Sequence, residues 1–244
     1  MKIKGIIFDK DGTLFALNGI WIDICQRLIM NIINNFQLPV NLKDKLLKGI
    51  GIKDNKIVSN SILASSTVHD LIEKLYEIIL KNTTKNINKK DFIEYGLEQI
   101  EFLSKEVEDN FITIANLDYI LDILKKQGFY LGLITADLKT TVIPFLERRN
   151  LVTYFDYIGA DDGEIEPKPN PKMLKEFCKE CNIKPQEVAV VGDSIKDIEF
   201  AKRGNSGLAI GVLSGTSTRK VLNRKCDYIF EDIERLIESD LLFS

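Results

Sequence analysis

The feature of this sequence that most constrains its fold is an alternation of short apolar runs with amphipathic stretches, which begins near residue 110. The runs contain almost no polar residues, which is typical of parallel strands that helices cover on both faces. We expect strands at 129–135, 154–159, 188–192, 207–212 and 227–230, with helices at 117–128, 139–149, 171–181 and 195–203 and a last helix after them. The apolar run at 3–8 has the same character and ends at an acidic turn. The sequence therefore predicts an α/β fold with one parallel sheet.

A long helical stretch separates the first predicted strand from the others. Apolar residues recur there at helical spacing, as in Ile24, Leu28 and Ile32 and again in Leu71 and Leu75. We find no convincing strand in this stretch. The prediction is an α/β core domain made of residues 1–17 and 108–244, interrupted by an all-helical domain at 18–107.

Composition excludes several classes of protein. The chain has 244 residues, of which 45% are hydrophobic and 28% charged, so it can bury a sizeable core. The formal net charge of −3 provides no basic field for nucleic acid or acidic lipid, and the longest apolar runs are too short to span a membrane. The first residues do not resemble a signal peptide, and four cysteines without framework spacing fit a reducing compartment. We therefore expect a cytoplasmic protein without nucleic-acid or membrane partners.

The residues that follow the predicted strands are mostly acids, small residues and one lysine. They are Asp9, Asp11, Gly12 and Thr13 after the first strand, Thr135 and Asp137 after the second, Lys168 in the loop after the third, and Gly192, Asp193, Ser194 and Asp197 after the fourth. In a doubly wound sheet, the carboxyl ends of the strands form the ligand-binding edge. We expect these residues to converge there.

Such a set of side chains suits phosphoryl transfer. Carboxylates held together repel one another unless a cation neutralises them, and oxygen ligands favour Mg²⁺. A carboxylate can attack phosphorus, and a second carboxyl two residues further on can protonate the leaving oxygen and then activate water. Lys168 can neutralise the transferring group, Thr135 can donate a hydrogen bond to it, and Gly12 leaves room for the turn.

Each of these pieces also has a structural interpretation. An Asp-x-Asp-Gly-Thr segment can be an acidic turn, a lysine between prolines can be solvated, and Gly-Asp-Ser can begin a helix. Their common position after strands favours the functional interpretation. Cys178 and Cys181 lack the second pair that a zinc site needs. The single histidine, His69, falls in the helical insertion and is expected to be structural or solvated, so we expect neither a His-based zinc site nor a Ser–His–Asp triad.

The combined pattern resembles the haloacid dehalogenase-like (HAD) hydrolase superfamily. The matching segments are Ile-Ile-Phe-Asp-Lys-Asp-Gly-Thr-Leu (6–14), Leu-Ile-Thr (133–135), Lys168 in Lys-Pro-Asn-Pro, and Val-Val-Gly-Asp-Ser-Ile-Lys-Asp (190–197). The resemblance covers the whole predicted core. Within the superfamily, the chain resembles the phosphoglycolate phosphatase and β-phosphoglucomutase branch, and Gly211-Val-Leu-Ser-Gly215 is similar to the phosphoglycolate phosphatase side.

This resemblance implies a Rossmann-like core with a helical cap of the first type, and a Mg²⁺-dependent phosphatase that forms an aspartyl phosphate. Asp9 would be the nucleophile and Asp11 the acid and base, with Thr135 and Lys168 completing the catalytic set. The implied phosphate-binding residues are Asp9, Gly12, Thr135, Ala136 and Lys168, and the implied Mg²⁺ ligands are Asp9, Asp11 through its carbonyl, Asp193 and Asp197, the last directly or through water. The expected substrate is a small phosphorylated metabolite, and the expected assembly is a monomer or homodimer.

The chain departs from the family pattern at two places, and both leave the substrate open. Ala16, Leu17 and Asn18 occupy the region where relatives often have an acidic residue, and Asp137 follows Ala136 where a small or amide residue is commoner. A phosphomutase that uses the same groups remains an alternative, as does a non-catalytic regulatory module that kept the fold. Dehalogenase chemistry and ion-transport ATPase activity are disfavoured.

Overall fold

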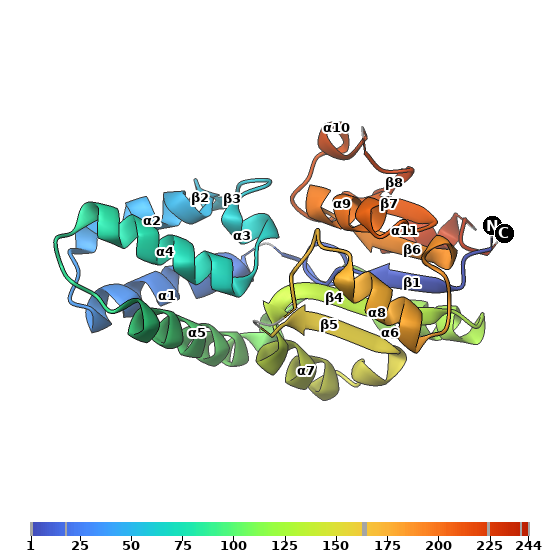
Figure 1. Cartoon of the computed structure of the whole chain (residues 1–244), viewed down its shortest axis with the longest axis horizontal. Coiled ribbons are helices and arrows are strands. Elements are labelled where there is room, and N and C mark those ends of the chain that lie inside the picture. Colours follow the sequence, from blue (N-terminus) through green and yellow to red (C-terminus); the bar gives the residue numbers. More distant parts are fainter. Residues whose placement is uncertain (1, 18, 163–164, 224, 240, 244) are drawn as a thin grey trace. The chain divides into compact units, whose positions relative to one another are not determined.

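The computed structural model describes residues 2–17, 19–162, 165–223, 225–239 and 241–243, so Asn18, the expected first residue of the insertion, lies outside the described residues. The chain divides into two compact units (Figure 1). Unit 1 joins Met1–Leu17 to Ile112–Ser244, and unit 2 is Asn18–Phe111.

Unit 1 is built on a parallel sheet with the first strand of the chain at its centre. Strand β1 (Gly5–Phe8) pairs with β4 on one side and β6 on the other, so that Gly5 is opposite both Tyr130 and Val188. The order of the six strands is β5-β4-β1-β6-β7-β8. The other bounds are Tyr130–Leu138 for β4, Tyr157–Asp161 for β5, Val188–Gly192 for β6, Leu208–Val212 for β7 and Tyr228–Phe230 for β8. The predicted α/β fold with a parallel sheet is confirmed.

Helices connect these strands, and their ends follow local sequence signals. Their bounds are Leu117–Lys126 for α6, Lys139–Arg148 for α7, Lys172–Glu180 for α8, Ile195–Arg203 for α9, Arg219–Leu222 for α10 and Ile233–Glu238 for α11, with 3₁₀ turns at Val152–Tyr154 and Pro185–Glu187. Asn116 caps the first turn of α6, and Ser194 and Asp197 form a capping box at the start of α9. The connection from α6 to β4 passes through Gly128, whose φ of +84° favours glycine.

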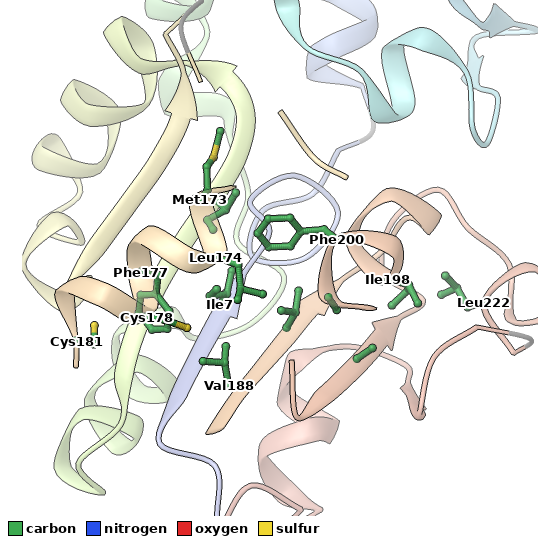
Figure 2. Close-up of a cluster of buried hydrophobic side chains, with 14 residues drawn as sticks. Ile7, Met173, Leu174, Phe177, Cys178, Cys181, Val188, Ile198, Phe200 and Leu222 are labelled. Carbon is green, nitrogen blue, oxygen red and sulfur yellow. The ribbon is translucent and has the colours of Figure 1, made fainter. Parts of the chain in front are cut away.

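Successive side chains of β1 enter different cores, because strand side chains alternate between faces. Ile7 belongs to a cluster in which helices α8 and α9 cover one face of the sheet (Figure 2). Leu174 and Phe177 from α8 and Phe200 from α9 are fully buried in this cluster. Ile6 and Phe8 point to the opposite face and are also fully buried. The sheet is therefore covered on both sides, as its apolar strands predict.

Unit 2 is a helical bundle with a small hairpin. Its helices are α1 (Ile20–Asn35), α2 (Lys43–Ile50), α3 (Ile62–Ser65), α4 (Val68–Asn82) and α5 (Lys89–Glu106), with 3₁₀ turns at Val40–Leu42 and Glu108–Asn110. The helices α1, α2, α4 and α5 form a closed ring, since α1 packs on α2 and α5 and α4 packs on the same two. Among the described residues, no helix combines the length and the apolar character needed to cross a membrane.

The structure corrects three details of the sequence prediction. Unit 2 continues to Phe111 instead of ending at residue 107, because the 3₁₀ turn at Glu108–Asn110 packs on α5. The helical unit contains a hairpin of β2 (Ile52–Lys53) and β3 (Lys56–Ile57), whose turn residues Asp54 and Asn55 both have positive φ. The strand expected at 154–159 begins only at Tyr157, since a 3₁₀ turn precedes it.

Candidate active site

The loop after β1 is a tight turn that places acids at the carboxyl edge of the sheet. The amide of Asp9 donates to the carbonyl of Val191 on the neighbouring strand (2.9 Å), and Gly12 donates to Phe15 (2.6 Å). Gly12 has a φ of +85°, and a Cβ atom on it would lie 2.7 Å from the Cγ of Asp193. Only glycine fits both this backbone conformation and this close approach.

Lys168 follows β5 and contacts three other segments, namely the loop after β1, strand β4 and helix α9 after β6. Its Nζ lies 2.5 Å from Oδ1 of Asp9, 2.6 Å from Oδ1 of Asp197 and 2.9 Å from the carbonyl of Ile134. The side chain is only 10% exposed. Burial opposes its charge, but Asp197 and Asp9 outweigh this effect and raise the pKa of Lys168 above its usual value. Lys168 is therefore a buried cation between two acids.

Three carboxylates meet beside this lysine. One oxygen each from Asp9, Asp193 and Asp197 lies within 4.8 Å of the others. Burial, followed by the charge of Asp197, raises the pKa of Asp193 to about 7. Burial also raises the pKa of Asp9 well above its ordinary value, and the neighbouring acids add to this effect while Lys168 opposes it. Such mutual repulsion is what a cation would relieve.

The loop after β7 binds and positions the side chain of Asp193. The backbone amide of Thr216 donates to Asp193 Oδ2 at 2.8 Å, and its hydroxyl lies 3.3 Å from the same oxygen. The hydroxyl of Ser214 donates to the carbonyl of Gly12 (2.7 Å), which ties this loop to the acidic turn. A Cβ atom on Gly215 would lie 2.0 Å from Asp193 Oδ2. No role at the site was expected for Ser214, Gly215 and Thr216, and the glycine within a hydroxyl-rich segment was the available signal.

Asp197 has donors on both carboxylate oxygens. Lys168 binds Oδ1, while the amide and hydroxyl of Ser194 lie 3.0 Å and 2.5 Å from Oδ2. These contacts come from the capping box of α9, so the same residues begin the helix and orient the acid. Asp197 is therefore held in place by Ser194 while it contacts Lys168.

Thr135 lies in β4 and is buried. Its Oγ1 accepts a hydrogen bond from the amide of Asp137 (3.2 Å), which leaves its own proton to be donated elsewhere. Ala136 lies between these two residues in the strand, where the pairing register of β4 with β5 shifts.

Asp11 takes part in a different set of contacts. Its Oδ2 accepts a hydrogen bond from Lys10 (2.8 Å), and Lys10 also bonds Asp137 (2.5 Å). Asp11 is not a member of the three-carboxylate cluster found among the described residues. Asp11 and Asp137 were both expected among the acids that follow the strands, and Asp137 was also noted as a departure from the family pattern, whereas Lys10 was assigned no role.

Comparisons with known proteins agree with this geometry. Residues 6–210 match the profile of the family described as "Haloacid dehalogenase-like hydrolase". The chain belongs to this family, which confirms the resemblance and the expectation of a hydrolase.

Several relatives span nearly the same length. "Pyrophosphatase PpaX" of Bacillus cereus (strain G9842) is 24% identical over 216 residues, which cover 88% of this chain and 85% of that protein. The crystal structure of a predicted phosphoglycolate phosphatase from Haemophilus somnus 129PT has a TM-score of 0.74 at 22% identity and covers 98% of each chain. A HAD phosphatase from Thermococcus onnurineus has a TM-score of 0.68 at 18% identity and covers 97% of each chain. At these identities the structural matches establish the fold.

Proposed function

We propose that the protein is a Mg²⁺-dependent phosphatase that hydrolyses a small phosphorylated metabolite through a phosphoaspartate on Asp9. The observation that supports this most strongly is the Lys168 contact with both Asp9 and Asp197, next to the Asp193 carboxylate. A nucleophile, a fixed cation and a candidate metal site then share one sheet edge. The names of the similar proteins, a pyrophosphatase and two phosphatases, agree with this proposal.

The acidic cluster fits Mg²⁺. It offers oxygen ligands only, and the raised pKa of Asp193 reflects repulsion and burial that a divalent ion would offset. We assign Asp9, Asp193 and the carbonyl of Asp11 as ligands. Asp197, whose oxygens already accept from Lys168 and Ser194, is assigned contact through water. When bound, Mg²⁺ would neutralise charge on the nucleophile and on the transferring phosphoryl group.

The chain's own residues perform the bond changes. A carboxylate oxygen of Asp9 forms a bond to phosphorus while the bond from phosphorus to the leaving oxygen breaks, and Asp11 gives its proton to that oxygen. Asp11 then removes a proton from water as the water attacks the phosphoaspartate, which releases phosphate and restores Asp9. Lys168 stays protonated throughout and binds the phosphoryl oxygens together with the Thr135 hydroxyl. The amide of Gly12, in the loop after β1, and that of Ala136, next to Thr135 in β4, are assigned to the same oxygens.

The helical unit, Asn18–Phe111, is proposed as the cap that selects the leaving group. The proposed phosphoryl-transfer residues all belong to unit 1, so they provide the same chemistry for every ester. Exchange of unit 2 for that of a relative is expected to change the ranking of substrates and leave the metal requirement unaltered. A cytoplasmic location is part of the proposal, since all four cysteines are free thiols.

The test is phosphate release from a panel of phosphorylated metabolites, measured with Mg²⁺ and with EDTA. Asp9→Asn is expected to lower kcat by at least about a thousandfold, because an amide neither attacks phosphorus nor binds the ion well. Asp227→Asn is the matched control, as Asp227 precedes β8 and accepts from the amide of Ala209 (2.8 Å) instead of joining the cluster. Substantial activity of Asp9→Asn, or turnover in EDTA equal to that in Mg²⁺, would refute the proposal.

The role of Asp11 needs a second comparison. Asp11→Asn is expected to slow hydrolysis of an alkyl phosphate much more than that of an aryl phosphate, because only the poorer leaving group depends strongly on protonation. Equal losses for both esters would assign Asp11 to metal binding or positioning instead.

A further inference from the structure

Lys10 is an unusual residue for a buried position. It lies between Asp9 and Asp11 in the tight turn, yet only 2% of it is exposed. Lysine is rarely buried without charged partners. Here Nζ contacts Oδ2 of Asp11 at 2.8 Å and Oδ2 of Asp137 at 2.5 Å, two acids that are far apart in the sequence.

Three segments of unit 1 enclose this ammonium group. Asp11 belongs to the loop after β1, Asp137 to the end of β4, and Phe145 to α7. The Phe145 ring centroid lies 5.5 Å from Lys10 Nζ, and the ring packs edge-on against Phe15 at 5.0 Å. These distances suit a cation–π contact inside a dry environment. The lysine is thus held by the fold rather than by solvent.

We propose that Lys10 and Asp137 are a positioning pair that fixes the orientation of the Asp11 carboxylate for proton exchange with the leaving group. This inference rests on the proposed function. An acid must lie within hydrogen-bond reach of the leaving oxygen, and an aspartate that rotates freely spends only part of its time there. The bond from Lys10 removes this freedom from Asp11, and the bond to Asp137 removes it from the flexible lysine stem.

The contacts of Asp137 connect the pair to the phosphate-binding side of the site. Its backbone amide donates to Oγ1 of Thr135, the hydroxyl assigned to the phosphoryl group. One residue of β4 thereby orients Thr135 through its backbone and Lys10 through its side chain. A salt bridge that served stability alone would not need to link these two groups.

The experiment compares kcat for an alkyl ester, glycerol phosphate, with kcat for an aryl ester, p-nitrophenyl phosphate. Lys10→Met and Asp137→Asn are each expected to lower kcat about 10- to 100-fold for the alkyl ester and less than about threefold for the aryl ester, since acid catalysis typically contributes 10²–10⁴. KM should stay within about threefold for both esters, because neither residue is assigned to substrate binding.

Tyr157→Phe is the matched control. It removes a side-chain hydrogen bond of 2.8 Å to Glu176 within the same unit, at the first residue of β5 instead of its carboxyl end. It should change both esters equally or leave both unchanged. Asp137→Asn keeps the size of the side chain, so it remains informative if Lys10→Met does not fold.

The outcome separates this inference from the proposed function. Suppose that Asp11→Asn slows the alkyl ester more than the aryl ester, but Lys10→Met and Asp137→Asn slow both esters equally. This result would overturn the positioning pair and keep the acid role of Asp11. Equal losses for both esters in Asp11→Asn would refute the acid role of Asp11 and, with it, the positioning pair. Selectivity in all three variants supports the inference.

Discussion

Substitution of Gly215 by alanine tests how the loop after β7 positions Asp193, and it does so without removing a polar group. The added Cβ atom would lie 2.0 Å from Oδ2, 2.2 Å from Cγ and 2.5 Å from Cβ of Asp193. The whole short side chain stands in the way, so rotation of its end does not relieve the clash. Asp193 must therefore move, and in moving it strains or loses the 2.8 Å bond from the Thr216 amide.

The size of the effect follows from these distances. Contacts under 3.0 Å are essentially absent for real Cβ atoms, so the carboxylate must shift by at least about 1 Å. Changes to groups that orient metal ligands typically lower affinity 10- to 100-fold. We expect Gly215→Ala to raise the Mg²⁺ concentration for half-maximal activity by about this factor, with a loss of roughly 1–3 kcal/mol in unfolding free energy from overpacking.

Two measurements check this prediction: a Mg²⁺ titration of phosphate release, and the rise in Tm caused by Mg²⁺. Gly211→Ala is the control, because its tightest contact would be with the flexible end of Leu222 at 3.0 Å, and its contacts with Cys226 Sγ (3.5 Å) and Leu222 Cβ (3.6 Å) are ordinary. The reasoning fails if Gly215→Ala binds Mg²⁺ as tightly as Gly211→Ala does.

Three further predictions concern pH, capping and the core. The pKa of Asp193 is raised from an ordinary 3.8 to about 7 in the folded protein, so between about pH 4 and pH 7 the folded state binds more protons than the unfolded state, and stability without metal falls as pH rises through this window. Mg²⁺ needs the ionised form, and the Tm shift it causes should be larger at pH 8 than at pH 6. Ser194→Ala removes the cap of α9 and a donor to Asp197, which should cost about 1 kcal/mol in urea unfolding and also lower kcat; an unchanged kcat would show that Lys168 does not need this support. Phe177→Ala, in the fully buried cluster under α8, should cost about 3–5 kcal/mol and leave the Mg²⁺ requirement unaltered in the same assays.

Elements that bury apolar side chains on regular positions were predictable from the sequence. The expected bounds of β6 and α9 agree with the structure, because an unbroken apolar run ends at Gly192 and a capping box begins at Ser194. The hairpin β2–β3 was missed, since strands of two residues are too short to show alternation. Its turn residues, Asp54 and Asn55, were the available signal.

The candidate site was predictable where residues follow strands, and less so where contacts cross the fold. Asp9, Lys168, Asp193 and Asp197 converge as expected, because parallel strands bring their carboxyl ends to one edge. The bond between Lys10 and Asp137 joins the turn after β1 to the end of the neighbouring strand β4, but a lysine in an acidic turn gives no sign in the sequence of its burial. The contact of Thr216 with Asp193 was missed because it also joins segments that are separate in the sequence.

The central place of β1 has a consequence for synthesis of the chain. Gly5 pairs with Tyr130 and Val188, so the strand that precedes Asp9, the proposed nucleophile, leaves the ribosome long before either of its neighbours. Unit 2, which lies between β1 and β4 in the sequence, forms a ring of helices. Its contacts join residues that are closer in sequence than the strands paired with β1, and such contacts form faster. We expect unit 2 to fold while β1 is still an unpaired, apolar segment, and Asp9 to meet Asp193 and Asp197 only after β6 has been added. Nascent chains that end between residues 138 and 188 would leave the β6 edge of β1 unpaired, and we expect such chains to be prone to aggregation.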